Sequence, residues 1–173
     1  MNKKLEKQAQ ETLSKIRALT RHIKNVEDSC ILLGEKLILN GEIELGHQLI
    51  ANGFKHDSSK FFGIEWDNLV GEPRQEDEKI VKLKLKLAIN HHNSTNFHHA
   101  EAWSGGIKGM PLVYLIELFC DWKARSEEFG TSLIDYIDNT ATKKFGFDKN
   151  DEIYKVLMKY MNLLCEKQFE IIK

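Results

Sequence analysis

The sequence predicts an all-α fold, a compact bundle of six to seven helices. The first reason is that proline is scarce, with only Pro73 and Pro111 among 173 residues. The second is that apolar residues recur at steps of three and four over long segments, which is the spacing of one helix face. The third is that the one segment with strand-like alternation has no second alternating run and no hairpin turn to pair with.

The first predicted helix is long and amphipathic. Its apolar positions run from Leu5 to Leu37 at helical spacing, and Asn40-Gly41 is a typical stop signal. A second helix is predicted over residues 43–55.

The segment IVKLKLKLAI, residues 80–89, is ambiguous. Its leucines alternate with lysines, which is a strand pattern, but both residue types are good helix formers. Leucine also has no strong strand preference. A lone strand in a helical chain would leave its backbone groups unpaired. We therefore predict a helix with apolar residues most of the way round and with lysine stems extending outward.

Three more helices are predicted in the last third of the chain. Pro111 is suited to the first turn of a helix that ends near Phe129. Residues 132–144 and 151–172 form the other two. The C-terminal helix is strongly amphipathic; packing on its own domain is the expected arrangement, and a homodimer is the alternative.

Composition sets limits on the class of protein. The length suits a single domain over residues 1–173, and the net charge of -1 gives no electrostatic reason to expect nucleic-acid binding. No apolar run approaches the ~20 residues of a membrane span, and the charged N-terminus does not resemble a signal peptide. Cys30, Cys120 and Cys165 are widely spaced, so we expect free, buried thiols in a cytoplasmic protein.

Four of the seven histidines lie in the segment NHHNSTNFHHAEAW, residues 90–103. They form two pairs, His91-His92 and His98-His99, in either a histidine-rich surface loop or one wall of a metal site. Neighbouring residues on a helix point about 100° apart. We therefore expect one histidine of each pair to face a metal, while the other contacts substrate phosphate or supports the ligands.

Four further residues are candidate ligands. His22 shares the apolar face of the first predicted helix, where a lone histidine is more often a core residue than a ligand. His56 and Asp57 are adjacent and could bind one metal, with the second carboxylate oxygen free to bridge to another; alternatively, Asp57 caps the next helical turn. Asp121 lies in an apolar helix, either bound to metal or paired with Arg125.

In chain order these residues read H, HD and D, at positions 22, 56–57 and 121. This order resembles the HD-domain superfamily of metal-dependent phosphohydrolases. KHDSSKF is also similar to the HDxGK segment of its cyclic-dinucleotide phosphodiesterases, with Ser59 in place of glycine. Together with HHNSTNFHH and CDWKARSEEFG, it resembles an uncharacterised family of small bacterial and phage proteins related to the HD group, over about residues 21–130. The two histidine pairs lie closer together than in typical two-metal HD enzymes.

The resemblance implies specific roles. The metal ligands it implies are His22, His56, Asp57, His91, His92 and Asp121, around one or two divalent ions of Mn, Fe, Co, Ni or Zn. The catalytic residues it implies are Asp57, Lys60, His98 and His99. Lys60 would contact phosphate, with a plain exposed lysine as the alternative, and a protonated His98 or His99 would assist the leaving group. Glu65 and Glu101 would orient ligand imidazoles.

The function implied by the resemblance is hydrolysis of a nucleotide or another small phosphoester by a metal-activated water. Two alternatives stay open. One is an HD-fold di-iron oxygenase, because the chain has enough histidines for a six-ligand set. The other is a non-enzymatic, metal-binding interaction protein.

Overall fold

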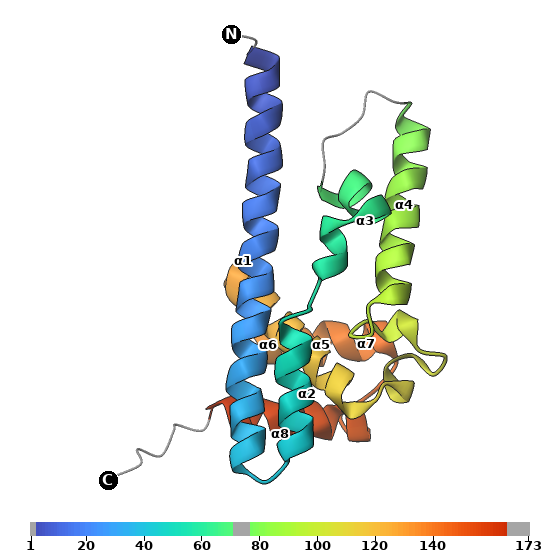
Figure 1. The fold of residues 1–173 in the computed structure, drawn as a ribbon. Coiled ribbons are helices and arrows are strands. Elements are labelled where there is room, and N and C mark those ends of the chain that lie inside the picture. Colours follow the sequence, from blue (N-terminus) through green and yellow to red (C-terminus); the bar gives the residue numbers. More distant parts are fainter. Residues whose placement is uncertain (1–2, 71–76, 166–173) are drawn as a thin grey trace, which may run out of the picture.

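The computed structural model describes residues 3–70 and 77–165, and within these ranges it contains helices and no strands (Figure 1). This confirms the all-α prediction. The α-helices are α1 (Lys3–Leu39), α2 (Ile43–Gly53), α3 (Gly63–Glu65), α4 (Glu78–Thr95), α5 (Leu112–Phe129), α6 (Leu133–Tyr136), α7 (Thr142–Phe145) and α8 (Glu152–Cys165). The 3₁₀ and π turns are η1 (Ser58–Phe61), η2 (Trp66–Val70), η3 (Ala100–Ala102), η4 (Gly106–Gly109) and η5 (Ile137–Ala141). Because α3 continues into η2, and α6 continues through η5 into α7, the eight α-helices of the described ranges form seven continuous segments.

The helix ends follow local sequence signals. α1 is followed by a turn in which Gly41 has a φ of 87°. α5 begins directly after Pro111 and ends at Gly130, whose φ of 63° is left-handed. Both ends agree with the prediction. The helix predicted over 132–144 corresponds to α6, η5 and α7, and α8 begins where predicted. The last part of that prediction, residues 166–172, lies outside the described residues.

The ambiguous segment 80–89 is helical, as predicted, and lies within α4. Asp77 caps this helix by accepting a hydrogen bond from the backbone N–H of Lys79 at 2.8 Å. Ala88 and His92 are its buried residues. The large aliphatic residues between Ile80 and Ile89 are 38–57% exposed, so most of the apolar surface of α4 faces solvent.

α1 and α2 pack as an antiparallel pair with their backbones in contact. A β-carbon on Gly46 would lie 2.5 Å from the carbonyl oxygen of Gly34, and one on Gly34 would lie 2.9 Å from the carbonyl oxygen of Gly46. Only glycine allows this approach. The close crossing fixes the position of the segment that follows α2.

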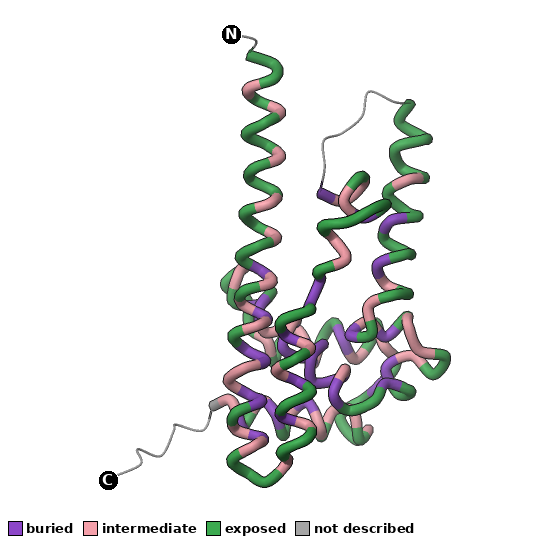
Figure 2. The backbone as a smooth tube through the Cα atoms, in the orientation of Figure 1, coloured by how far each residue is buried: buried purple, intermediate pink, exposed green. Residues whose placement is uncertain are grey.

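The core lies between the C-terminal half of α1, α2, α5 and α8. At the centre of α5, Ile116, Phe119 and Cys120 are fully buried. Cys30 and Cys120 are free, buried thiols, as predicted, and the side chain of Cys165 lies outside the described residues. Figure 2 shows this buried region in the lower part of the molecule, with the N-terminal halves of α1 and α4 exposed above it. Among the helices described, none has the length and apolar character needed to cross a membrane.

Candidate metal centre

Seven buried or partly buried side chains converge where α1, α4, α5 and two connecting loops meet. They form three overlapping groups whose potential ligand atoms lie within 4.8 Å of one another. The groups are His22, His56 and Asp57; Asp57, His92, His98 and His99; and His56, His98 and Asp121. Such groups of imidazole nitrogens and carboxylate oxygens could hold a metal ion.

The first ligand group contains His22, His56 and Asp57, with Asp121 beside it. The Nε2 atom of His22 is 3.0 Å from Oδ1 of Asp121 and 3.9 Å from Oδ2 of Asp57. The Nε2 atom of His56 is 3.8 Å from the same Oδ2 atom. Both Nε2 atoms therefore face a common carboxylate oxygen.

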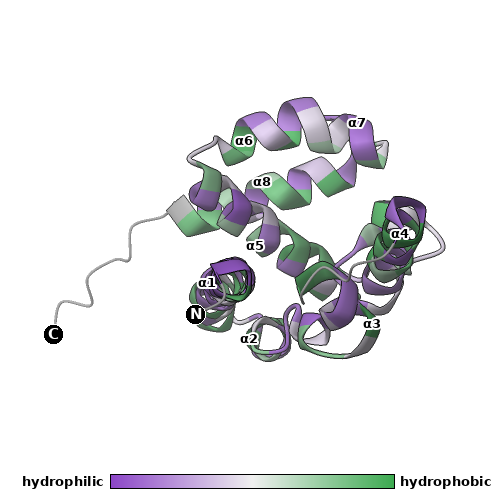
Figure 3. Cartoon of the chain, turned by 90° about the horizontal axis from the view of Figure 1, so that it is seen from above, coloured by the Kyte–Doolittle hydropathy of each residue, from purple (hydrophilic) through white to green (hydrophobic). Residues whose placement is uncertain are grey.

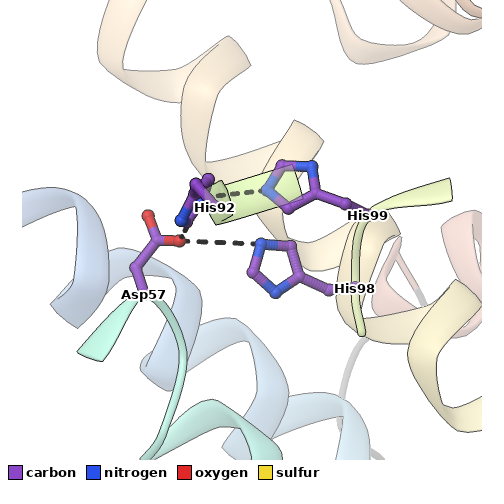
Figure 4. Close-up of side chains that lie close together, drawn as sticks. All are labelled: Asp57, His92, His98 and His99. Carbon is purple, nitrogen blue, oxygen red and sulfur yellow. Dashed lines mark hydrogen bonds and ion pairs between the residues drawn. The ribbon is translucent and has the colours of Figure 1, made fainter. Parts of the chain in front are cut away.

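The second ligand group contains Asp57, His92, His98 and His99, and Figure 4 shows their rings pointing toward one another. Oδ1 of Asp57 is 3.2 Å from Nε2 of His92 and 3.6 Å from Nε2 of His98. The Nε2 atom of His99 is 2.9 Å from Nε2 of His92. This group therefore places three imidazoles around the second oxygen of the same carboxylate.

Asp57 connects the two groups through an unusual backbone conformation. Its φ of 54° and ψ of 12° are left-handed, and no other non-glycine residue described has a positive φ. Aspartate tolerates this region, at a cost of about 1–2 kcal/mol. Although Asp57 precedes η1, its side chain makes no capping hydrogen bond. The capping alternative is therefore not what the structure shows, and each carboxylate oxygen faces one ligand group.

Four buried atoms at the centre lack a hydrogen-bond partner: Nε2 of His56, Oδ1 of Asp57, Nε2 of His98 and Oδ1 of Asp121. A buried polar atom without a partner costs about 1–3 kcal/mol. These atoms are all candidate metal ligands, and bound cations would satisfy them. The residues present therefore fit a divalent metal.

Glu117 of α5 orients one histidine from each group. Its Oε1 atom is 3.1 Å from Nδ1 of His56 and 3.3 Å from Nδ1 of His98. A carboxylate that accepts the Nδ1–H fixes the tautomer and leaves the Nε2 lone pair toward the centre. One glutamate therefore supports both groups.

Glu128 and Glu65 each support one group. Oε1 of Glu128 is 3.0 Å from Nδ1 of His22, and Oε2 of Glu65 is 2.8 Å from Nδ1 of His92. Glu65 is fully buried, so its contact with His92 is shielded from water. With Glu117, these two residues turn four ligand histidines so that Nε2 faces inward.

The carboxylates at the centre are ionised. Burial would raise the pKa of Asp57, but the close contact with His92 and the nearby charges of His56 and Lys60 hold it well below its usual range. Burial likewise opposes a low pKa in Glu117, yet the hydrogen bonds from His56 and His98 lower it to about 2. The centre therefore offers full negative charge to a cation at neutral pH.

Two histidines of the second group have pKa values that are shifted in opposite directions. Burial, followed by the charges of His98 and His92, lowers the pKa of His99 to about 3. Burial also acts to lower the pKa of His98, but the hydrogen bond and charge of Glu117 outweigh it and raise the pKa. At neutral pH, His99 is therefore an uncharged imidazole with one nitrogen lone pair available to a metal.

The predicted ligand His91 lies outside the centre, which corrects the sequence prediction. Its side chain is 49% exposed, and its Nδ1 atom is 2.8 Å from Oε1 of Glu65. His91 and His92 are neighbours on α4, so only one ring of this pair can point inward. In the second pair both rings reach the centre, because His99 is in extended backbone and the helical argument does not apply there.

Two alternatives for single residues are also resolved. Nζ of Lys60 lies 2.5 Å from Oδ2 of Asp57, and its side chain is only 17% exposed, so it is not a free surface lysine. Arg125 pairs with Glu128, with Nη1 of the arginine 3.1 Å from Oε2 of the glutamate, and leaves Asp121 to the histidines.

Glu101, predicted to orient an imidazole, is exposed in η3, and Glu117 and Glu128 perform that role. These two glutamates were not predicted. The available signal was their spacing, four residues before and seven after Asp121, which places three carboxylates on one face of α5.

A pocket of about 510 Å³ borders the centre, a size that suits a small organic molecule. His56, His98 and Glu117 form its inner wall, so the pocket touches the outer side of the ligands. The remaining wall is lined by Asn52, Lys55, Ser58, Ser59, His91, Thr95, Asn96, Phe97 and Tyr114.

Comparison with known proteins gives one match. A family of unknown function, DUF5662, matches residues 11–167, a range that includes every side chain of the centre. No curated protein and no solved structure matches the chain.

Proposed function

We propose that this chain, which belongs to the DUF5662 family, is a metal-dependent phosphohydrolase. Its substrate would be a nucleotide or another small phosphoester. The observation that carries the proposal is the pair of ligand groups that share Asp57, each with Nε2 atoms turned toward it. Two ligand groups joined by one carboxylate are typical of sites that act on phosphoryl groups. The H, HD, D order of the ligands supports the same reading.

The ligands divide between two ions. His22, His56, Asp57 and Asp121 would hold one, and Asp57, His92, His98 and His99 would hold the other. Bound divalent metals would supply an activated water and Lewis-acid neutralisation of charge on the phosphoryl oxygens. We assign His98 and His99 to metal binding in preference to proton donation, because their Nε2 atoms face Asp57 and His92.

Lys60 is the residue placed to bind phosphate. Its ammonium contacts Oδ2 of Asp57, the oxygen that also faces His22 and His56. A cation in the first group would compete for this oxygen and free the ammonium to pair with a phosphate oxygen.

The test begins with protein purified without chelators. Metal content is measured by mass spectrometry, and phosphate release is measured over a panel of nucleotides and small phosphoesters with added Mn or Co. We expect two ions per chain and phosphate release that is lost in Asp57→Asn. His47, an exposed histidine on α2, provides the control His47→Ala, which should keep both properties. Metal-loaded protein that releases no phosphate from any member of the panel would contradict the proposal.

A di-iron oxygenase is the second candidate. The specific observation is that His22, His56, Asp57, His92, His98 and Asp121 complete a set of four histidines and two carboxylates around one bridging residue. Copurified iron with substrate-dependent oxygen uptake, and no phosphate release, would favour this activity. If metal removal only destabilises the fold, with neither reaction observed, the metal has a structural role.

A further inference from the structure

Helix α1 carries an unbroken seven-residue repeat along its whole length. Steps of four and three residues connect a single seam, and nine of its ten members are apolar. The seam residues are Leu5, Ala9, Thr12, Ile16, Leu19, Ile23, Val26, Cys30, Leu33 and Leu37. A strict seven-residue repeat is the pattern of a helix that packs lengthwise against other helices.

Among the residues that the structure describes, the C-terminal half of this seam is covered and the N-terminal half is not. Val26, Cys30, Leu33 and Leu37 are fully buried in the core. In the N-terminal half, Leu5 is 61% exposed, and the other large seam residues are only partly buried. Figure 2 shows α1 changing from buried to exposed as it leaves the body of the molecule. The seam continues for about five turns past the core, and no described helix packs along it there.

A second exposed apolar stripe lies on α4. Ile80, Leu83 and Leu87 follow one another at steps of three and four residues and are 47%, 57% and 48% exposed. α1 and α4 extend from the same side of the body in the same direction (Figure 1). Seen end-on, the two helices lie apart from each other (Figure 3). An isolated helix of this length is marginally stable in water, and exposed apolar surface of this extent marks an interaction site.

We propose that the N-terminal half of α1, residues 5–23, pairs antiparallel with the same segment of a second copy of this chain. The exposed stripe of α4 adds contact area at the edge of this interface. A contact between two helices of this length is small compared with the ~800 Å² per partner of a stable interface, so the α4 stripe would complete it.

The repeat is complementary to itself, which is why the partner is a second copy. A two-fold axis at residue 14 brings Leu5 opposite Ile23, Ala9 opposite Leu19, and Thr12 opposite Ile16, each pair shared between the two chains. Each small or polar seam residue thus meets a large aliphatic one. The pairing also ends at Ile23, directly before the seam enters the core at Val26, so no part of the protruding seam is left unpaired.

A residue outside the seam supports the same axis. Leu13 is 49% exposed and lies off the seam that enters the core. It lies one residue from the axis, so its symmetry mate would cover it. Lys15 lies at the same distance on the other flank and would face its own mate. Added salt should therefore strengthen the dimer by screening this like-charge contact, whereas it would weaken binding of an acidic partner.

The test is the oligomeric state of the full chain by sedimentation at micromolar concentration, with helical content as the folding check. Ile16→Glu and Leu19→Glu place charge in the seam and should raise the dimer dissociation constant at least about 100-fold without loss of helix. Leu39→Glu is the matched control, because Leu39 lies on the same helix, off the seam, and is 81% exposed. This control should remain dimeric.

A covalent trap tests the axis directly. Leu13→Cys should form a disulfide-linked dimer under mild oxidation, and Leu39→Cys should not. A wild-type chain that sediments as a monomer would overturn the proposal, and so would a dimer that tolerates both seam substitutions.

Discussion

The two ligand groups of the metal centre differ in what holds them in place. In the first group, His22 and Asp121 come from α1 and α5, which pack against each other in the core. In the second group, His92 lies near the end of α4, and His98 and His99 lie in the loop before η3. The first group is therefore positioned by helix packing, and the second by a helix end and a loop. We expect the first group to bind its ion more tightly.

The carboxylates that contact the ligand groups also differ between the two groups. Glu128 contacts only the first group, and Glu65 contacts only the second. Asp57 and Glu117 serve both. Each group thus has one glutamate of its own, and the two groups share the carboxylates of Asp57 and Glu117. Substitution of a shared carboxylate should affect both metal sites, and substitution of Glu128 or Glu65 should affect one.

The largest effect is expected from Asp57→Asn, because this residue belongs to both groups of potential ligands. Asparagine fits the left-handed backbone at this position but lacks the charge. Affinity at both groups should fall by more than about 100-fold, beyond the range for residues that only orient ligands. Bound metal is measured after dialysis, with His47→Ala as the control. Retention of both ions in the variant would contradict the shared role of Asp57.

The next effect is expected from Glu117→Gln, because Glu117 holds the Nδ1 atoms of His56 and His98. Affinity should fall by about 10–100-fold at both groups, since both imidazoles lose their charged acceptor. Calorimetric titration of the metal-free protein with Mn or Zn measures the two sites.

Glu128→Gln is the matched comparison, because it removes the same charge from a residue that contacts His22 alone. It should weaken one site and leave the other unchanged. Equal losses at both sites in this variant would show that the groups are not separate in their outer residues.

A smaller effect is expected in the pH dependence of the metal-free protein. The pKa of His99 is lowered from 6.5 to about 3, so the unfolded chain binds this proton first and stability falls as the pH drops below about 6.5. The pKa of Glu117 is lowered from 4.5 to about 2, so its contribution is present above 4.5 and is lost as the pH falls toward 2.

Thermal unfolding between pH 7 and pH 3 measures both contributions. His99→Asn should flatten the curve from pH 6.5 down to about 3, and Glu117→Gln should flatten it below pH 4.5. A curve that keeps the wild-type shape in both variants would contradict these assignments.

The smallest effect is expected from His91→Ala, because this ring is half exposed and lies outside the centre. Metal affinity should change by less than about threefold, as for an ordinary surface substitution. The measurement is the same calorimetric titration. A loss as large as that of Glu117→Gln would place His91 among the residues that hold the metals.

Much of the fold was predictable because its signals are local. Glycine and proline mark the ends of α1 and α5, and each acts on its own few residues. The order of His22, His56-Asp57 and Asp121 likewise identified residues that the structure brings together.

The remainder depends on long-range packing and could not be read from the pattern. His91 and His92 are equivalent in sequence, and only the position of α4 against Glu65 decides which ring points inward. The exposure of α4 was missed for a related reason, since the apolar content of a helix does not show whether a partner lies within the same chain. Glu117 was missed because a glutamate in a helix is ordinarily a surface residue.

The wide sequence separation of the ligands has a consequence for folding kinetics. His22 and Asp121 must meet across most of the chain before either group exists, and such long-range contacts form late. Metal would then bind after the transition state for folding has been crossed. Metal should therefore slow unfolding while leaving the folding rate unchanged, so that a bound metal would lengthen the lifetime of the folded state.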